Sequence, residues 1–212
     1  MKVSEKNQLL FIDFEFTMPE GKMKHKEFFP EIIEVGIVYV KDTEVSETYS
    51  SYVKPVHFPK VSERCKNFLK VSQENIDAGI TFKEFVQILS DYRGKSKSPI
   101  TVITWGNMDM KVLRQNCQRN GEVFPFETSE FRDLSMEYKR FFGDRNQTGL
   151  WKAVEDYGKK GTGKHHRALD DAMTTYHIFK LVEEDKRYLQ KPTPPTIGDR
   201  IDLTQVLKNY AT

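Results

Sequence analysis

Two carboxylates stand two positions apart in an apolar segment near the start of the chain. Asp13 and Glu15 interrupt the segment Gln8–Phe16, whose aromatic and aliphatic residues predict a β-strand. Because alternate residues of a strand point to the same face, the two carboxylates are expected to project together. Burial of carboxylates without compensation is costly, and a divalent cation would compensate both. The pair therefore indicates a metal site, with a solvent-exposed strand face as the alternative.

A third carboxylate follows a second apolar strand. Asp109 comes after the predicted strand Ile100–Trp105 and begins a predicted helix, Asp109–Arg119. Loops at the carboxyl ends of strands are where open α/β sheets bind ligands. A carboxylate at a helix N-terminus is also an ordinary cap, so Asp109 alone favours neither interpretation.

A histidine and an aspartate lie five residues apart where the longest helical pattern begins. This pattern runs from His166 to Leu189 and includes Asp171. Five helical steps rotate a side chain by about 140°, so the two residues cannot share one helix face. We expect His166 on the adjoining loop and Asp171 on the helix proper, which suits a mobile acid or base beside a fixed ligand.

Taken together, these signals resemble the DnaQ-like 3′–5′ exonucleases of the DEDDh type. That family has Asp-x-Glu on its first strand, an Asp after a later strand and His-x-x-x-x-Asp on a late helix. Arg167 stands four residues before Asp171, where tyrosine-type members carry Tyr, which indicates the histidine subtype. The surrounding sequence is similar to the RNA-trimming, ERI-like branch of this family and, within that branch, to a bacterial group of sporulation inhibitors. The segments that carry this similarity are FIDFEFT, EIIEVGIV, WGNMDMKVL and HHRALDDA.

The resemblance implies a two-metal phosphodiester hydrolase. Asp13 would bridge two Mg²⁺ or Mn²⁺ ions, and Glu15, Asp109 and Asp171 would complete their shells, since hard cations prefer oxygen ligands. One ion would activate the attacking water and the other would stabilise the leaving oxygen. His166 would take the proton from the water as general base.

Two further expectations concern the surroundings of His166. The neighbouring imidazole of His165 is expected to point elsewhere. The glycines Gly158, Gly161 and Gly163 precede the histidine, so the loop should have few side chains to hold it and should be mobile without substrate.

The substrate implied by the resemblance is single-stranded or 3′-overhanging RNA, with DNA as the second choice, degraded to 5′-mononucleotides. Substrate contacts are expected from the family at Phe14, Phe16, Thr17 and Met110. A basic cluster beside His166 would hold backbone phosphates, with a solvated loop as the alternative; its members are Lys159, Lys160, Lys164 and Arg167.

Two other classes of function stay open at this point. A regulatory or scaffold protein could use the same fold to bind nucleic acid or protein. A metal-dependent phosphatase would use a similar acidic site but release free phosphate instead of nucleotides. The resemblance further implies a role in sporulation control.

These residues need a sheet and helices to bring them together. The strand-like segments Gln8–Phe16, Glu31–Val40 and Glu47–Pro55 predict an antiparallel meander, followed by alternating strand and helix. Ser62 can cap a helix, and Thr81 with Glu84 forms a capping box for another. The expected fold class is α/β, an RNase H-like mixed five-stranded sheet flanked by helices.

Composition and length are those of a globular domain. The chain has 212 residues, 33 Lys and Arg, 31 Asp and Glu, a net charge of +2 and two distant cysteines. These numbers exclude global disorder and a bulk polycation, and they favour the reducing cytoplasm. No signal peptide or membrane span is expected. Residues 1–190 are predicted to form the exonuclease domain, and residues 191–212 a Pro-rich linker with a short C-terminal helix that packs on or extends it.

Overall fold

The computed structural model describes residues 8–20, 28–95 and 99–190. By its internal contacts the chain divides into residues 1–179 and residues 180–212. The first unit holds the sheet, and residues 180–190 of the second continue the last helix. The predicted linker and C-terminal helix at 191–212 lie outside the described residues, so the division at residue 190 stays a prediction. No helix within the described ranges is long and apolar enough to cross a membrane.

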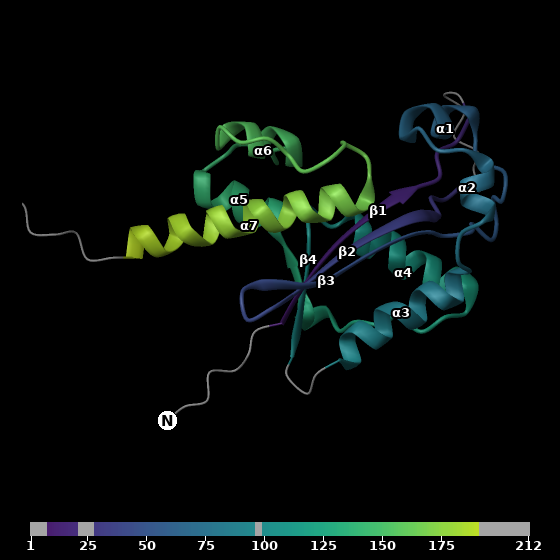
Figure 1. Ribbon diagram of the computed structural model, residues 1–212, viewed down its shortest axis with the longest axis horizontal. Coiled ribbons are helices and arrows are strands. Elements are labelled where there is room, and N and C mark those ends of the chain that lie inside the picture. Colours follow the sequence, from purple (N-terminus) through teal and green to yellow (C-terminus); the bar gives the residue numbers. More distant parts are fainter. Residues whose placement is uncertain (1–7, 21–27, 96–98, 191–212) are drawn as a thin grey trace, which may run out of the picture. The chain divides into compact units, whose positions relative to one another are not determined.

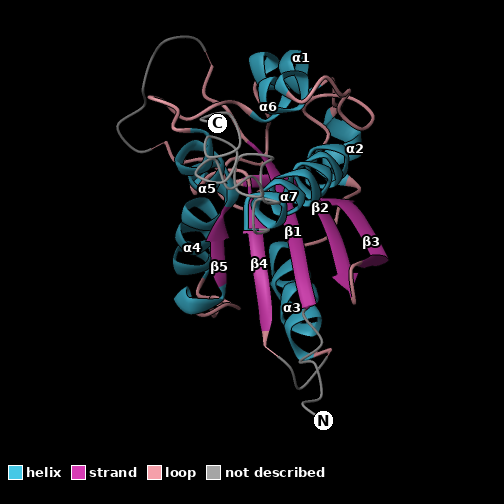
Figure 2. Ribbon diagram, turned by 90° about the vertical axis from the view of Figure 1, so that its left-hand side faces the viewer, coloured by secondary structure: helices cyan, strands magenta, loops and turns pink. Residues whose placement is uncertain are grey.

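The first unit is built on one mixed sheet of five strands in the order β3-β2-β1-β4-β5 (Figure 2). β1 and β3 are both antiparallel to β2, whereas β4 is parallel to β1 and to β5. This arrangement confirms the predicted meander and the mixed sheet. The strands are β1 (Gln8–Phe16), β2 (Ile32–Lys41), β3 (Glu44–Tyr52), β4 (Ile100–Thr104) and β5 (Phe131–Asp133).

The third strand begins earlier than predicted. Asp42 and Thr43 turn the chain with positive φ angles of 53° and 77°, a pattern typical of two-residue hairpins. β3 therefore starts at Glu44 instead of Glu47 and ends at Tyr52 instead of Pro55.

Helices follow the meander and then alternate with the last two strands. Ser62 caps the first of them, and Thr81 and Glu84 form the predicted capping box. The sequence did not predict α2, because five residues with one buried side chain leave no periodic pattern. The helices are α1 (Glu63–Leu69), α2 (Gln73–Asp77), α3 (Phe82–Gly94), α4 (Met108–Asn120), the 3₁₀ turn η1 (Thr128–Glu130), α5 (Leu134–Phe142), α6 (Leu150–Asp156) and α7 (Ala168–Gln190).

The central strand β1 is buried on both faces. Leu10, Ile12 and Phe14 belong to the main core with residues of α3 and α4. Phe11 points the other way, and its ring centroid lies 5.3 Å from that of Tyr176 on α7. Figure 1 shows α3 and α4 on one side of the sheet and the beginning of α7 on the other. By the two-residue period of the strand, Asp13 lies on the same face as Phe11, toward α7.

The start of α7 lies directly on β2 at Gly36. A Cβ atom added to Gly36 would come within 2.1 Å of the backbone carbonyl carbon of Ala168. Gly36 is also the cross-strand partner of Asp13. Glycine at this position therefore lets the first turn of α7, which carries Asp171, approach the sheet beside Asp13.

Candidate active site

One cavity of about 280 Å³ collects the residues singled out by the sequence. It lies where β1 and β4 end and α4 and α7 begin. The five predicted ligand and base residues all line it, namely Asp13, Glu15, Asp109, His166 and Asp171.

Three of the carboxylates are close enough to share one ion. Asp13, Glu15 and Asp171 each offer an oxygen, and these oxygens lie within 4.8 Å of one another. Asp109 stands in the first turn of α4, where its Oδ1 accepts the backbone N–H of Phe14 at 3.0 Å. This hydrogen bond fixes the start of α4 against β1, so the fourth carboxylate is held at the same cavity.

Burial, and after it mutual repulsion, destabilises the charged forms of these carboxylates. Burial, followed by repulsion from Asp171, raises the pKa of Glu15 to about 8. Burial raises the pKa of Asp109 to about 7. Burial and then the charges of Asp109 and Asp171 raise the pKa of Asp13 well above its usual value. The same effect of burial raises the pKa of Asp171. A nearby positive charge would stabilise the charged forms of these four carboxylates. Hard divalent cations would supply that charge, and they prefer oxygen ligands.

His166 lies on the loop that precedes α7, as predicted. Its backbone adopts a left-handed φ of 63°, and its N–H donates to Asp171 Oδ2 at 2.9 Å. The ring Nδ1 lies 3.9 Å from Glu15 Oε1. Burial and the neighbouring His165 lower the pKa of His166, so the neutral imidazole that can accept a proton is favoured.

The prediction that His165 points elsewhere is wrong. Its ring stacks on that of His166 with centroids 3.8 Å apart and planes 15° apart. It also lies 4.9 Å from the ring of Trp151 and lines the same cavity. The left-handed backbone at His166 turns the chain, so consecutive side chains do not alternate as they would in extended backbone.

The loop before His166 is also held more firmly than its glycines suggested. The backbone N–H of Lys164 donates to Asp170 Oδ2 at 2.8 Å. A Cβ added to Gly163 would lie 2.1 Å from the Asp170 carboxyl carbon, and one added to Gly161 would lie 2.5 Å from the Trp151 ring. The expectation of few anchoring contacts is therefore wrong, because the glycines permit close approach. Asp170 anchors the loop, while Asp171 faces the cavity.

Two aromatic residues that sequence reasoning missed surround His166 and Asp171. The Phe68 ring on α1 lies 4.4 Å from the His166 ring, with 49 % of Phe68 exposed. The Trp151 indole on α6 donates to Asp171 Oδ1 at 2.6 Å. Helical periodicity indicates only which residues are buried and gives no signal for these contacts.

Arg167 is engaged inside the fold and does not extend the lysine cluster. Its Nη2 lies 3.1 Å from Glu34 Oε1, and its Nη1 donates to the Tyr52 hydroxyl at 2.8 Å. Glu34 on β2 is a further residue that sequence reasoning did not identify. The expectation that Arg167 acts together with Lys159, Lys160 and Lys164 is therefore not supported, because the buried Glu34 carboxylate pairs with its guanidinium.

The residues predicted to contact substrate do not all lie at the carboxylate cavity. Phe14 and Phe16 line the carboxylate cavity. Thr17 lines a second cavity, and its Oγ1 accepts the backbone N–H of Glu31 at 2.9 Å. Met110 is 7 % exposed and packs in the main core. Lys164 is exposed at the surface, as are Lys159 and Lys160.

Comparison with known proteins supports the family assignment. Residues 10–179 match the family model for Exonuclease, RNase_T. The chain is 62 % identical over 202 residues to the "Probable 3′-5′ exonuclease KapD" of Bacillus subtilis strain 168, covering 95 % of this chain and 97 % of that protein. It is 28 % identical over 185 residues to the "3′-5′ exoribonuclease 1" of Rattus norvegicus. That match covers 84 % of this chain and 53 % of the rat protein, about half its length.

A solved structure has the same fold. It is the nuclease domain of 3′hExo, a DEDDh family member, bound to rAMP. Its TM-score is 0.77 at 27 % sequence identity, covering 86 % of this chain and 94 % of that one. The likeness confirms the predicted RNase H-like fold. With the family model matching most of its length, the chain belongs to the Exonuclease family and is a 3′–5′ exonuclease of the DEDDh type.

Proposed function

We propose that this exonuclease removes 5′-mononucleotides from the 3′ end of single-stranded or 3′-overhanging RNA, in preference to DNA. Its cofactors would be two divalent ions, Mg²⁺ or Mn²⁺. The observation that carries the proposal is the shared cavity, which is lined together by four carboxylates with raised pKa values and by His166, whose pKa is lowered.

The ions would be held by the acidic side chains of the cavity. Asp13, Glu15 and Asp171 already bring oxygens within 4.8 Å of one another, and Asp109 is fixed beside them by its bond to Phe14. When bound, the ions would supply the positive charge that compensates these carboxylates and the negative charge that develops on the phosphoryl group.

His166 would act as the general base in the hydrolysis. The lowered pKa of His166 favours its neutral imidazole, in which one ring nitrogen can accept a proton from water. The His165 and Phe68 rings, centred 3.8 Å and 4.4 Å from it, limit the orientations of this imidazole. The bond from its backbone N–H to Asp171 fixes the loop relative to the carboxylates.

Recognition of the strand would combine rings and exposed cations. Phe16 lines the cavity and is only partly buried, so its ring could stack on a base of any type, whereas Phe14 is 3 % exposed and packs in the main core. The names of two relatives support the proposed preference for RNA: the rat protein is named an exoribonuclease, and one solved relative recognises the histone mRNA stem-loop.

Matched RNA and DNA oligonucleotides of one sequence, radiolabelled at every phosphate, test the proposal with Mg²⁺ and with Mn²⁺. We expect 5′-mononucleotides, faster from RNA, and none from Asp13→Asn, the matched inactive control. Release of free phosphate would instead favour a phosphatase. Binding of the oligonucleotide without release of any product would favour a scaffold protein.

The lysines beside His166 need a separate test of phosphate contact. Neutralising Lys159, Lys160 and Lys164 to Gln should weaken binding and reduce the slope of log affinity against log salt, by close to one per lost contact. The same change at the exposed residues Lys41, Lys54 and Lys83 is the charge-matched control. Equal slopes in the two triple variants would contradict a substrate role for Lys164 and its neighbours.

A role in sporulation control stays a prediction. Its test is the timing and yield of spores in a host strain that carries only Asp13→Asn instead of the wild-type chain. Unchanged sporulation would contradict a role for the nuclease activity.

A further inference from the structure

Trp151 links one of the proposed metal ligands to the two histidines beside it. It is the second residue of α6 and lines the carboxylate cavity. Its indole Nε1–H donates to Asp171 Oδ1 at 2.6 Å. Trp151 is only partly buried, so burial alone does not oblige this N–H to find a partner within the protein. The indole is nevertheless aimed at a carboxylate of the site.

Two contacts hold the Trp151 ring in place. The chain approaches it at Gly161, where an added Cβ would lie 2.5 Å from the ring. The centroid of the His165 ring lies 4.9 Å from that of Trp151. Because its neighbours are this close, the indole has little room to rotate away from Asp171.

The hydrogen bond from Trp151 fixes one oxygen of the Asp171 carboxylate, and a second hydrogen bond fixes the other. Asp171 Oδ2 accepts the backbone N–H of His166 at 2.9 Å. With one donor on each oxygen, the carboxylate cannot turn about its Cβ–Cγ bond without straining both hydrogen bonds. Each carboxylate oxygen has two lone-pair sites, so both oxygens can still reach an ion. Hydrogen bonds of this kind orient ligating carboxylates in metal sites.

Trp151 also stands at one end of a row of four rings. The His165 ring lies between those of Trp151 and His166, and Phe68 on α1 packs against His166. Successive centroids along this ring row are 4.9 Å, 3.8 Å and 4.4 Å apart. The proposed general base therefore lies inside the ring row, and Trp151 is the member whose side chain also bonds to a proposed metal ligand.

We propose that Trp151 is a positioning residue for the hydrolysis: its indole N–H orients the Asp171 carboxylate toward the metal ions, and its ring supports the His166 imidazole through His165. Trp151 acts through these residues and not by contact with the substrate. The inference rests on the proposed two-metal function and adds to it a residue that ties the ligand to the base.

Mn²⁺ binding to the protein without RNA tests the role of the indole N–H. Trp151→Phe keeps an aromatic ring but removes the donor, and it should weaken Mn²⁺ binding by about 10- to 100-fold, the range for hydrogen-bond partners of metal ligands. Trp105→Phe is the matched control, because Trp105 lines the same cavity but donates to the backbone carbonyl of Thr148 at 3.0 Å. Electron paramagnetic resonance of unbound Mn²⁺ gives both dissociation constants. Equal constants in the two variants would overturn the role of the N–H.

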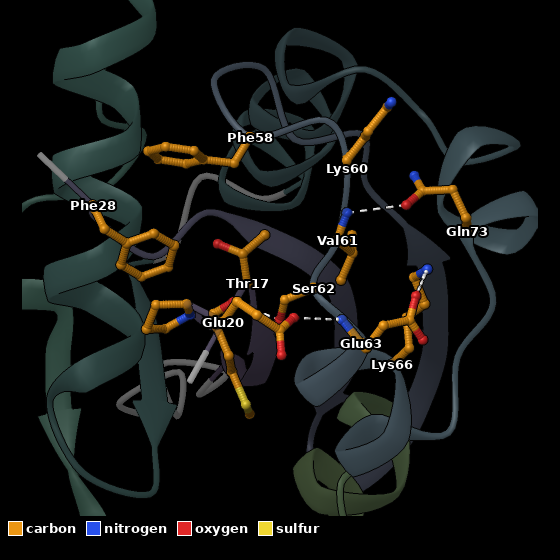
Figure 3. A pocket seen from close by; sticks show the side chains of 12 residues that line it. Thr17, Glu20, Phe28, Phe58, Lys60, Val61, Ser62, Glu63, Lys66 and Gln73 are labelled. Carbon is orange, nitrogen blue, oxygen red and sulfur yellow. Dashed lines mark hydrogen bonds and ion pairs between the residues drawn. The ribbon is translucent and has the colours of Figure 1, made fainter. Parts of the chain in front are cut away.

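A second control lies in the separate cavity that Thr17 lines, which shares no lining residue with the carboxylate cavity. Phe58 lies beside Phe28 there, with ring centroids 5.1 Å apart (Figure 3). Phe58→Leu removes a ring outside the ring row and should bind Mn²⁺ as tightly as the wild type. Weakening as large as that in Trp151→Phe would show that the loss of any ring disturbs the site, and it would overturn the inference.

A measurement on the wild type covers the case in which Trp151→Phe melts at a lower temperature. The chain has two tryptophans, so its NMR spectrum contains two indole N–H signals. During titration with Mg²⁺ the Trp151 signal should move as Asp171 binds the ion, and the Trp105 signal should move less. A Trp151 signal that stays in place at saturating Mg²⁺ would overturn the link between the indole and the metal site.

Steady-state kinetics on a short RNA at saturating Mn²⁺ separates positioning from substrate binding. Trp151→Leu, which removes both the donor and the ring, should lower kcat more than Trp151→Phe does, with little change in KM. In a His165→Ala background this difference between Phe and Leu should disappear, because the ring acts through His165. A rise in KM at constant kcat would show that Trp151 contacts the substrate and would overturn its assignment as a positioning residue.

Failure of this inference is distinguishable from failure of the proposed function. A wild type that binds Mn²⁺ and releases nucleotides, together with wild-type constants in both Trp151 variants, would overturn the inference alone. A wild type that neither binds Mn²⁺ nor releases nucleotides would overturn the proposed function and this inference with it.

Discussion

Glu34 and Arg167 form an ion pair, with 3.1 Å between Oε1 and Nη2, that joins the sheet to the residue following the proposed general base. Glu34 is 2 % exposed, and its Oε2 has no hydrogen-bond partner among the described residues. Burial raises the pKa of Glu34, and the Arg167 charge opposes this effect. His166 adopts a left-handed backbone that non-glycine residues rarely adopt. Two contacts hold this conformation: its own N–H donates to Asp171, and the next residue, Arg167, is paired with Glu34.

Arg167→Lys should lower kcat by about 10- to 100-fold, as is typical when a residue supporting a metal site is changed, with little change in KM. A lysine cannot make the two separate contacts of the guanidinium with Glu34 and Tyr52. Steady-state kinetics on a short RNA provides the measurement, and Tyr52→Phe, which removes only the hydroxyl contact, is the milder control. An increase in KM at constant kcat would instead show that Arg167 binds substrate.

His166→Ala should lower the single-turnover rate by about 10²- to 10⁴-fold, the range for loss of a general base, while oligonucleotide and metal affinity stay close to wild type. His165→Ala should have a smaller but measurable effect, because its ring supports the His166 ring from 3.8 Å away. Both rates are measured at saturating metal. A larger loss in His165→Ala than in His166→Ala would reverse the two roles.

Asp13→Asn and Asp171→Asn should both abolish hydrolysis but affect stability differently. Asp13 is repelled by its acidic neighbours, so the metal-free Asp13→Asn protein should melt at or above the wild-type temperature. Asp171 accepts hydrogen bonds from Trp151 and from the His166 backbone. Asparagine offers only one acceptor oxygen, so one of these two donors would be left unpaired, which should cost about 1–3 kcal/mol of unfolding free energy. Chemical denaturation in EDTA measures both, and wild-type activity in either variant would contradict the metal-ligand assignment.

The metal-free protein should lose stability as the pH rises from about 5 to about 8. The pKa values of Glu15 and Asp109 rise to about 8 and about 7 on folding, so in this interval the folded chain binds more protons than the unfolded chain. Unfolding then releases protons, and its free energy falls with increasing pH. Mg²⁺ should therefore raise the melting temperature more at pH 8 than at pH 5.5. An equal effect of Mg²⁺ at the two pH values would contradict this linkage.

Much of the site was predictable because its residues act through local geometry. The two-residue period of β1 places Asp13 and Glu15 on one face, and the five-residue spacing places His166 before the helix that carries Asp171. The alternation of apolar segments likewise predicted the strands and the mixed sheet. These features depend on the periodicity of the backbone, which is determined by residues close to one another in the sequence.

Only the tertiary structure decided which side chains surround those residues. The Arg167–Tyr52 hydrogen bond joins positions 115 residues apart, and the Phe14–Asp109 bond joins positions 95 apart. The stacking of His165 on His166 depends on a left-handed backbone that neighbouring contacts hold in place. Glu31 likewise accepts the backbone N–H of Phe58, which lies 27 residues away along the chain. Such contacts arise from packing between elements, whose free energy depends on the whole fold and not on the spacing of residues within one segment.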